Sequence, residues 1–413
     1  MKDKRSLPVC VAVGLLVAVG VAQSAERVET IQAEYEIPED LLLDVGIRVF
    51  DPGTGDQDGQ ELEEKGIFQD VRRSEARYIP FQLKHTLEST GQWGAVRVVP
   101  VDSDSVDVTI TGEILKSSGY EMGLKIRITD ASGRVWRKDT YNEDAYTVSY
   151  DPGSLERRDP FQNVYNRIAN DMLVARERLE VGDLRTIREL SRLRFGADIA
   201  PHAFADYLSV DRKGRYTIEK LPSEDDPMMQ RIALIRERDY MFVDTLNEYY
   251  SDFYARMDEP YHDWRVFSYE EESALREIRR KARKRKILGG LLIFAGIVAD
   301  DSSSVGRVAK DAAVIGGLAT VQSGINKSKE SKIHKAAIEE LAASFDSEMA
   351  PLLVQVEGQT LKLEGTAEDQ FAEWRRLLAE LFRAETGLPV DSDEVEPVDP
   401  NAASTEPHPS YPG

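Results

Sequence analysis

The stretch DVTITGEIL at residues 107–115 alternates apolar with polar side chains, and LKIRIT at residues 124–129 repeats the pattern. Alternation of this kind is typical of β-strands that bury one face. The sequence DASG at residues 130–133 is typical of a turn, and residues 135–141 follow as a further strand. These residues therefore predict an antiparallel meander.

A strand and a helix are predicted upstream of the meander. VGIRVF at residues 45–50 alternates like a half-buried strand and is followed by the breaker DPG at residues 51–53. Apolar residues then recur at the spacing of one buried helix face. They are Ile79, Leu83 and Leu87.

The ends of this helix are also predicted. Pro80 is expected near its first turn, where proline is tolerated, and Gly91 is expected at its end. Residues 96–99 follow as a short strand. The order strand, helix, strand, meander predicts an α+β domain over residues 26–150 that folds alone.

These residues resemble a known domain of the bacterial cell envelope. LESTGQW at residues 87–93 and VRVVP at residues 96–100 are similar to the helix end and second strand of the TolB amino-terminal domain. Related domains occur in the curli-secretion lipoprotein and in penicillin-binding-protein activators. DVTITGEI at residues 107–114 is similar to a glycine-containing strand of that group, and residues 124–133 are similar to its next hairpin.

The resemblance covers about a quarter of the chain, residues 40–145. Nothing after Tyr150 is similar to the β-propeller of TolB, so the particular partners of TolB are not implied. The resemblance implies a periplasmic α+β domain that contacts other proteins and has no catalytic residues.

The first 25 residues have the pattern of a secretory signal peptide. Lys2, Lys4 and Arg5 precede an apolar stretch at residues 7–21, and the small residues at 22–25 precede Glu26. This order of charged, apolar and small residues predicts export to the periplasm or the envelope membranes, with cleavage after the small residues. An uncleaved membrane anchor is the alternative.

Composition limits the kind of protein. The chain has 53 Lys plus Arg against 74 Asp plus Glu, a formal net charge of −21, which disfavours binding to nucleic acid. The single cysteine, Cys10, lies within the signal, so the mature chain is expected to have neither a disulfide nor thiol chemistry. The chain is long enough for two or three globular units.

The second unit, residues 159–286, is predicted to be helical. Phe242, Leu246, Phe253 and Met257 share one helix face, which we interpret as core rather than as a binding groove. The unit ends in a basic run, which is either a solvated helix end or a contact for anionic lipid or an acidic partner. Its members are Arg279, Arg280, Lys281, Arg283, Lys284, Arg285 and Lys286.

Residues 287–324 are predicted to form an apolar helical hairpin rich in Gly and Ala. Residues 287–299 are apolar or Gly, residues 300–304 form a polar turn, and residues 312–321 are apolar again. Each arm is too short to span a bilayer. Small residues spaced by four allow close helix packing, oligomerisation or membrane contact. They are Ala309, Ala312, Ala313, Gly316, Gly317, Thr320 and Gly324.

A small α/β module is predicted over residues 331–387. One helix face, at Ile333, Ala337, Leu341 and Phe345, precedes a β-hairpin around residues 357–360. Thr366 and Asp369 have capping-box spacing for a last helix, ended by Gly387. The inward face of that helix consists of Phe371, Trp374, Leu378 and Leu381. Residues 390–413 are acidic and rich in Pro, and are expected to be disordered.

The sequence contains no recognisable enzyme motif. A nucleophile elbow, a phosphate loop and a zinc-protease motif are all absent from it, and its five histidines lack metal-ligand spacing. Asp51, Asp56 and Asp58 are interpreted as solvated loop residues rather than as a weak cation site. We therefore expect no catalytic residue, no bound metal and no cofactor.

The predicted fold class is α+β, with a mostly helical second part, an apolar hairpin and a small C-terminal module. The predicted function is that of a non-enzymatic envelope accessory or assembly protein, which binds other envelope proteins and self-associates or touches a membrane. Two alternatives remain at this point. One is a component of a secretion or transport pore, and the other is an envelope hydrolase without a recognisable motif.

Overall fold

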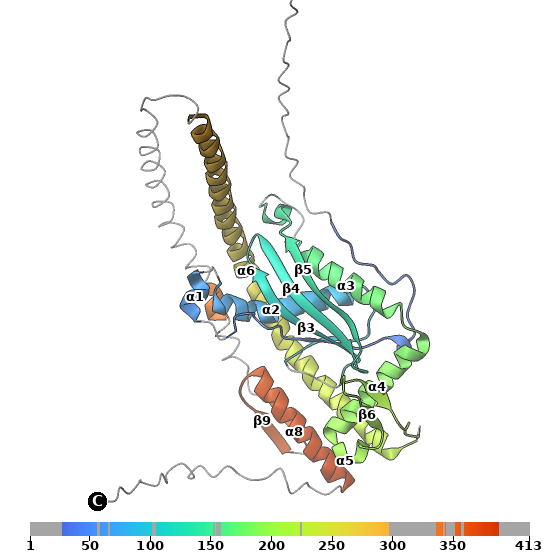
Figure 1. Cartoon of the computed structure of the whole chain (residues 1–413). Helices are drawn as coiled ribbons and strands as arrows, with labels where there is room; N and C mark the ends of the chain where they lie inside the picture. The colour runs from blue at the N-terminus through green and yellow to red at the C-terminus, as the bar shows by residue number, and fades with distance from the viewer. Residues whose placement is uncertain are drawn as a thin grey trace, which may run out of the picture.

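The chain is an α+β protein in which one mixed sheet is followed by helices (Figure 1). The structure is a computed structural model, and the residues that it describes are 27–55, 58–64, 67–100, 105–151, 153, 158–223, 225–296, 336–341, 343, 352–356 and 359–387. The predicted signal peptide and the acidic tail lie outside these residues.

The sheet has five strands in the order β2-β1-β3-β4-β5. They are β1 (Val45–Arg48), β2 (Val96–Val99), β3 (Val108–Ser117), β4 (Glu121–Asp130) and β5 (Val135–Asp144). β1 runs parallel to both β2 and β3, whereas β3, β4 and β5 are antiparallel. The predicted strand, helix, strand and meander are therefore confirmed.

The alternation in the sequence decides which face of the sheet is buried. Ile110 of β3 lies opposite Ile128 of β4, and both are fully buried. Thr111 lies opposite Arg127 on the other face, where Arg127 is exposed. One face therefore packs against helices, and the other face is polar.

Helix α2 (Gln69–Ser89) covers the buried face, and it corrects the prediction for Pro80. Pro80 lies in the middle of α2 rather than in its first turn. A proline removes the hydrogen bond to the carbonyl four residues earlier, here that of Ala76. The backbone N–H of Phe50, two residues after the end of β1, donates to the Ala76 carbonyl at 2.9 Å and satisfies the freed acceptor. Gly91, at φ 65°, follows the end of the helix as predicted.

Two more helices complete this core. In α3 (Gln162–Arg176), Tyr165 and Ile168 are fully buried against the sheet, and α4 (Val181–Ile199) adds Ile187 to the same core. The unit around the sheet is therefore larger than residues 26–150, because α3 and α4 supply part of its core.

The first described residues lie along α3. Asn170 accepts a hydrogen bond from the Ile31 N–H at 2.9 Å and donates to the Glu29 carbonyl at 2.8 Å. Asn166 donates to the Val28 carbonyl at 2.7 Å. These side-chain amides replace the backbone partners that an extended segment would find in a sheet.

Truncation of Leu83 tests the core of this unit. Leu83 is fully buried between α2 and the sheet, as are Ile79 and Leu87. Leu83→Ala is expected to lower the free energy of unfolding by about 2–5 kcal/mol, because it leaves a cavity in the core. Urea unfolding of the two proteins measures this difference. Unchanged stability would contradict the assigned core.

Residues 201–218 differ from the helical prediction. After the short α5 (Pro201–Phe204), β6 (Leu208–Val210) and β7 (Tyr216–Ile218) form an antiparallel hairpin. The Asp211 carboxylate accepts from the backbone N–H groups of Lys213 and Arg215, and Gly214 has φ 74°. This Asp-to-Gly turn closes the hairpin, and it is visible in the sequence.

Helix α6 (Pro227–Gly296) runs along the whole molecule. Its predicted stripe is core, since Phe242, Leu246, Phe253 and Met257 are all at least 95% buried. Asn247 on the same helix closes the edge of the sheet. Its amide accepts from the Val98 N–H and donates to the Val98 carbonyl, both at 2.9 Å, so α6 takes the place of a sixth strand beside β2.

The C-terminal module has the predicted hairpin and helix. β8 (Leu352–Val356) pairs with β9 (Gln359–Leu363), and Thr366 and Asp369 form a capping box on α8 (Ala367–Thr386). Trp374 of α8 stacks on Phe242 of α6 with ring centroids 5.1 Å apart. The module therefore shares one core with α6 and is not packed on its own. Of its predicted first helix, Ala337 and Leu341 are described, whereas Ile333 and Phe345 are not.

The remaining elements are short. They are η1 (Glu39–Leu41), α1 (Gly59–Glu64) and η2 (Thr147–Tyr150).

Candidate functional site

The predicted basic run lies near the end of α6. The helix continues through residues 279–286 to Gly296 without a break, so the boundary predicted at residue 286 is not a boundary of the helix. Within the run, the structure describes the side chain of Arg280, which is exposed. For Arg279 and residues 281–286 it describes the backbone alone.

The second arm of the predicted hairpin lies outside the described residues. This includes all of its predicted contact residues, which are Ala309, Ala312, Ala313, Gly316, Gly317, Thr320 and Gly324. The first arm is described as helical backbone as far as Gly296.

The turn between β3 and β4, residues 118–120, contacts α6 about two to four helical turns before the basic run, and we call it the clamp. Ser118 Oγ donates to Glu272 Oε2 at 2.7 Å, and the Gly119 N–H donates to Ser268 Oγ at 3.1 Å. A Cβ atom on Gly119 would lie 1.8 Å from the Arg265 carbonyl oxygen. Only glycine therefore allows the turn to approach the helix this closely.

Aromatic contacts extend the clamp towards the basic run. Tyr120 stacks on Tyr269 with ring centroids 5.7 Å apart, and the guanidinium of Arg276 lies 3.7 Å from the centroid of the Tyr120 ring. Arg276 also pairs with Glu272 at 2.6 Å. The clamp thus fixes the direction in which α6 leaves the sheet.

A side chain at position 119 is expected to weaken this contact. Gly119→Ala should lower the free energy of unfolding by about 1–3 kcal/mol, because the clamp or the helix backbone must move to admit Cβ. The matched control is Gly182→Ala on α4, where nothing lies within 4 Å of the new Cβ. Chemical denaturation of both variants measures the effect. If Gly119→Ala were as stable as Gly182→Ala, residues 118–120 would not be packed tightly against α6.

A buried charge network lies beneath the clamp. Arg265 of α6 is 2% exposed, and its Nη1 donates to Asp159 Oδ2 at 2.8 Å. Its guanidinium lies 3.9 Å from the centroid of the Tyr261 ring. Burial opposes the charged form, but Asp159 and the surrounding tyrosines hold the pKa of Arg265 well above its ordinary value. The residue is therefore a charged side chain in the core.

The network extends from α6 to α2 and the sheet. Tyr261 Oη donates to Glu75 Oε1 at 2.7 Å, and Ser117 Oγ at the end of β3 donates to the same oxygen at 2.6 Å. Burial raises the pKa of Tyr261 well above its ordinary value, so the phenol is a donor at neutral pH. These bonds fix the position of α6 relative to the sheet along the helix axis.

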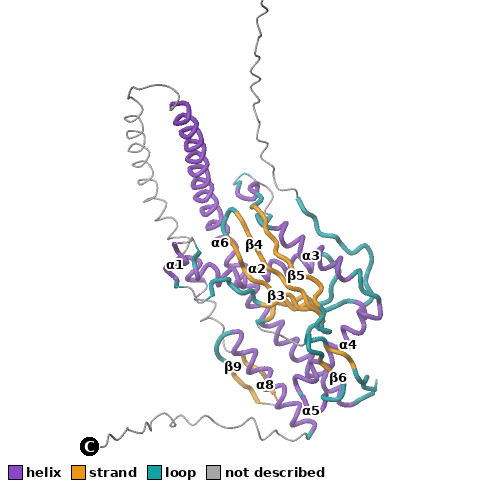
Figure 2. The backbone as a smooth tube through the Cα atoms, in the orientation of Figure 1, coloured by secondary structure: helices purple, strands orange, loops and turns teal. Residues whose placement is uncertain are grey.

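Beyond the clamp, α6 extends away from the body of the protein (Figures 1 and 2). Phe267 is the last buried side chain that the structure describes on this helix. Residues 277–296 then add a further length of about 30 Å at 1.5 Å per residue. Among the helices of the described chain, none has an apolar stretch long enough to cross a bilayer.

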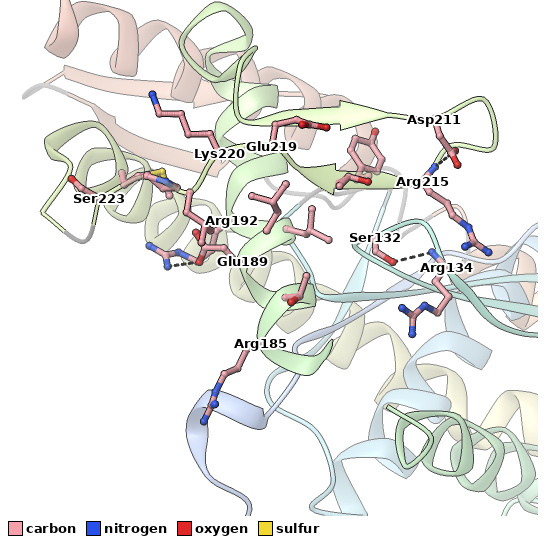
Figure 3. A pocket seen from close by; sticks show the side chains of 18 residues that line it. Ser132, Arg134, Arg185, Glu189, Arg192, Asp211, Arg215, Glu219, Lys220 and Ser223 are labelled. Carbon is pink, nitrogen blue, oxygen red and sulfur yellow. Dashed lines mark hydrogen bonds and ion pairs between the residues drawn. The ribbon is translucent and has the colours of Figure 1, made fainter. Parts of the chain in front are cut away.

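A groove of about 1170 Å³ opens at the other end of the molecule, between α4, the β6–β7 hairpin and the start of α6 (Figure 3). We call it the cationic groove. Apolar lining residues include Leu190, Ile218 and Met229. Five basic side chains line it, which are Arg134, Arg185, Arg192, Arg215 and Lys220. Three acidic ones do so as well, which are Glu189, Asp211 and Glu219.

Some of these charges are paired. Arg192 binds Glu189 at 2.9 Å, and Arg185 is directed out of the groove to Asp40 at 2.8 Å (Figure 3). The ammonium of Lys220 lies 5.5 Å from the Tyr207 ring centroid. Neither Lys220 nor Arg215 forms an ion pair with a described residue, and both are exposed. The chain has a net charge of −21, yet basic side chains outnumber acidic ones in this groove. Apolar side chains also line it.

Three of the five histidines are described, and they lie on three different helices. His85 on α2 packs edge-on against Phe81 and Tyr254, where burial and the nearby Lys84 lower its pKa. His202 and His262 lie on α5 and α6. Within the described ranges, no group of three or more His, Cys, Asp or Glu side chains is placed to hold a metal ion.

In the acidic loop after β1, the two carboxylates that the structure describes accept hydrogen bonds from the backbone. Asp51 Oδ1 accepts from the Gly53 N–H at 2.8 Å, and Asp58 Oδ1 accepts from the Gln60 N–H at 3.4 Å at the start of α1. Both carboxylates are turn or cap acceptors. Asp56 lies outside the described residues.

The chain matches no protein-family model, and searches of curated proteins and of solved structures found no similar protein. Sequence reasoning placed the basic run on a helix but missed the clamp and the cationic groove. Gly119 and the Asp211–Gly214 turn can both be recognised in the sequence. Each of them, however, contacts a segment that is distant from it in the sequence. A pattern of nearby residues therefore does not reveal either site.

Proposed function

We propose that this chain is a non-enzymatic accessory or assembly protein of the bacterial cell envelope, tethered to a membrane by the projecting end of α6. The observation that carries the proposal is the continuity of α6. A single helix leaves the clamp, carries the basic run and continues into the apolar residues 287–296. The basic residues thus lie between the body of the protein and an apolar end.

This order suits an anionic membrane surface. Clustered Lys and Arg next to an apolar segment gain about 1 kcal/mol each from anionic lipid near the surface. An apolar arm of 13 residues, 287–299, has the length of a segment that enters a bilayer without crossing it. The second arm, with its rows of small residues, would return beside the first by close packing.

The α+β unit supplies the partner-binding part of the proposal. We base this part on the resemblance of residues 40–145 to the TolB amino-terminal domain, which implies a periplasmic type of domain used for protein contacts. The polar face of its sheet is available for such contacts, since α2 and α3 occupy the other face. Export by the signal at residues 1–25 would place this unit in the periplasm.

Vesicle flotation tests the tether. Full-length mature protein is expected to float with anionic phosphatidylglycerol vesicles, and a variant with residues 277–335 replaced by a short Gly-Ser linker is expected to remain in solution. Circular dichroism and a cooperative melt of the variant show that its body is intact. Equal recovery of both proteins would refute the tether.

Intact mass of the protein recovered from periplasm tests export. A mature chain that begins near Ala25 or Glu26 is the expected result. A chain that still begins at Met1 would show that the apolar stretch at residues 7–21 is an anchor. In that case the α6 end would be a second membrane contact rather than the tether.

A further inference from the structure

The cationic groove lies beside the point where the acidic tail begins. Arg231, on the first turns of α6, donates to the carbonyl of Glu385 at the end of α8 at 2.9 Å. Met229, two residues earlier on α6, lines the groove. Helix α8 ends at Gly387, so the tail begins near one end of the groove.

The sequence of the tail complements the basic and apolar side chains that line the groove. Residues 388–413 contain no Lys or Arg, and six of them are acidic, namely Asp391, Asp393, Glu394, Glu396, Asp399 and Glu406. Val390, Val395 and Val398 are interspersed among these carboxylates. Such a segment offers apolar side chains for the floor of the groove and carboxylates for the basic side chains around it.

The tail is also long enough to extend from Gly387 into the groove. An extended chain covers about 3.3 Å per residue, so residues 388–399 reach roughly 40 Å from Gly387. Pro389, Pro397 and Pro400 favour an extended conformation, which lowers the entropy lost on binding.

We propose that residues 388–400 bind in the cationic groove of their own chain. Arg215 and Lys220, the groove cations without an ion pair to a described residue, would bind the tail carboxylates, and the half-buried Ile218 and the exposed Leu221 would contact its valines. Because the tail is tethered at Gly387, its effective concentration at the groove is in the millimolar range, and a weak contact suffices for occupancy. An acidic segment of another protein must displace the tail to bind there.

A peptide titration tests this proposal. A fluorescent peptide LPVDSDEVEPVDPNA, residues 388–402, is titrated with full-length protein and with protein ending at Gly387. The peptide should bind the shortened protein, and it should bind the full-length protein at least tenfold more weakly, because the attached tail competes. High salt should weaken the interaction with the shortened protein.

Charge reversals locate the interaction. In the shortened protein, R215E/K220E should weaken peptide binding at least tenfold. The matched control is R212E/K213E, two exposed residues of the same hairpin that do not line the groove. If both variants lost the same peptide affinity, binding would depend on the net charge of the protein and not on the groove, which would overturn the proposed site. Failure of the peptide to bind, or equal binding to full-length and shortened protein, would overturn occupancy by the tail.

Discussion

Replacing Arg265 with methionine is expected to lower the free energy of unfolding by about 3–5 kcal/mol. The change leaves the Asp159 carboxylate, which is 8% exposed, without its cationic partner. It also removes the guanidinium that stacks on Tyr261. An unpaired buried charge is costly because neither water nor another cation replaces the lost partner. Urea unfolding at neutral pH measures the change.

A second substitution separates the ion pair from packing. Asp159→Asn removes the charge but keeps an oxygen that can accept the Phe161 N–H, now bonded at 2.8 Å. The double variant R265M/D159N should therefore recover part of the stability lost in R265M. Arg73→Met, at an exposed ion pair of α2, is the control and should change stability by less than about 0.5 kcal/mol. If R265M matched this control, the buried network would not hold α6.

Neutralising four cations of the basic run should have the largest functional effect. In the quadruple variant Lys281, Arg283, Lys284 and Arg285 are replaced by Gln. At about 1 kcal/mol for each lost cation, partitioning onto anionic vesicles should fall roughly 10³-fold. The helix is retained, because Gln, Lys and Arg have similar helix propensities. Centrifugation with vesicles of graded phosphatidylglycerol content measures the partition coefficient.

The control is a second quadruple variant that removes four positive charges from the body of the protein. Arg73, Arg127, Lys138 and Arg212 are exposed on the body, and their replacement by Gln should leave partitioning nearly unchanged. Raised salt should reduce the difference between the two quadruple variants, since screening weakens surface attraction. If the two variants partition alike, net charge rather than the position of the run determines binding.

The elements of the sheet could be predicted because each repeats its own short pattern. Residues 107–115 and 124–129 alternate because one face is buried, and Thr366 and Asp369 mark the start of α8 through a local capping box. Pro80, by contrast, lies in the middle of α2 and not in its first turn as predicted. The carbonyl that it frees is satisfied by Phe50, 26 residues before Ala76, and nothing near Pro80 in the sequence indicates this.

The arrangement of the sites depends on contacts between distant segments. The composition changes abruptly after Lys286, which predicts a boundary, yet α6 continues to Gly296, and residues 279–296 contain no proline that would interrupt it. Gly119 contacts a helix almost 150 residues further along the chain, and the cationic groove combines side chains from β4–β5, α4, β7 and α6. These contacts are set by tertiary packing, so they first become visible in the structure.

The depth at which a single label on α6 enters the bilayer tests the membrane tether. The only cysteine is Cys10 in the predicted signal, so a cysteine introduced into the mature chain can carry an environment-sensitive NBD fluorophore. With anionic vesicles, a label at residue 292 should shift its emission to the blue and become accessible to quenchers in the acyl chains. A label at residue 280 should report the headgroup region, and one at Met241, which is 63% exposed on the body, should not change. Unchanged emission at residue 292, or equal shifts at residues 292 and 241, would show that the end of α6 does not enter the membrane.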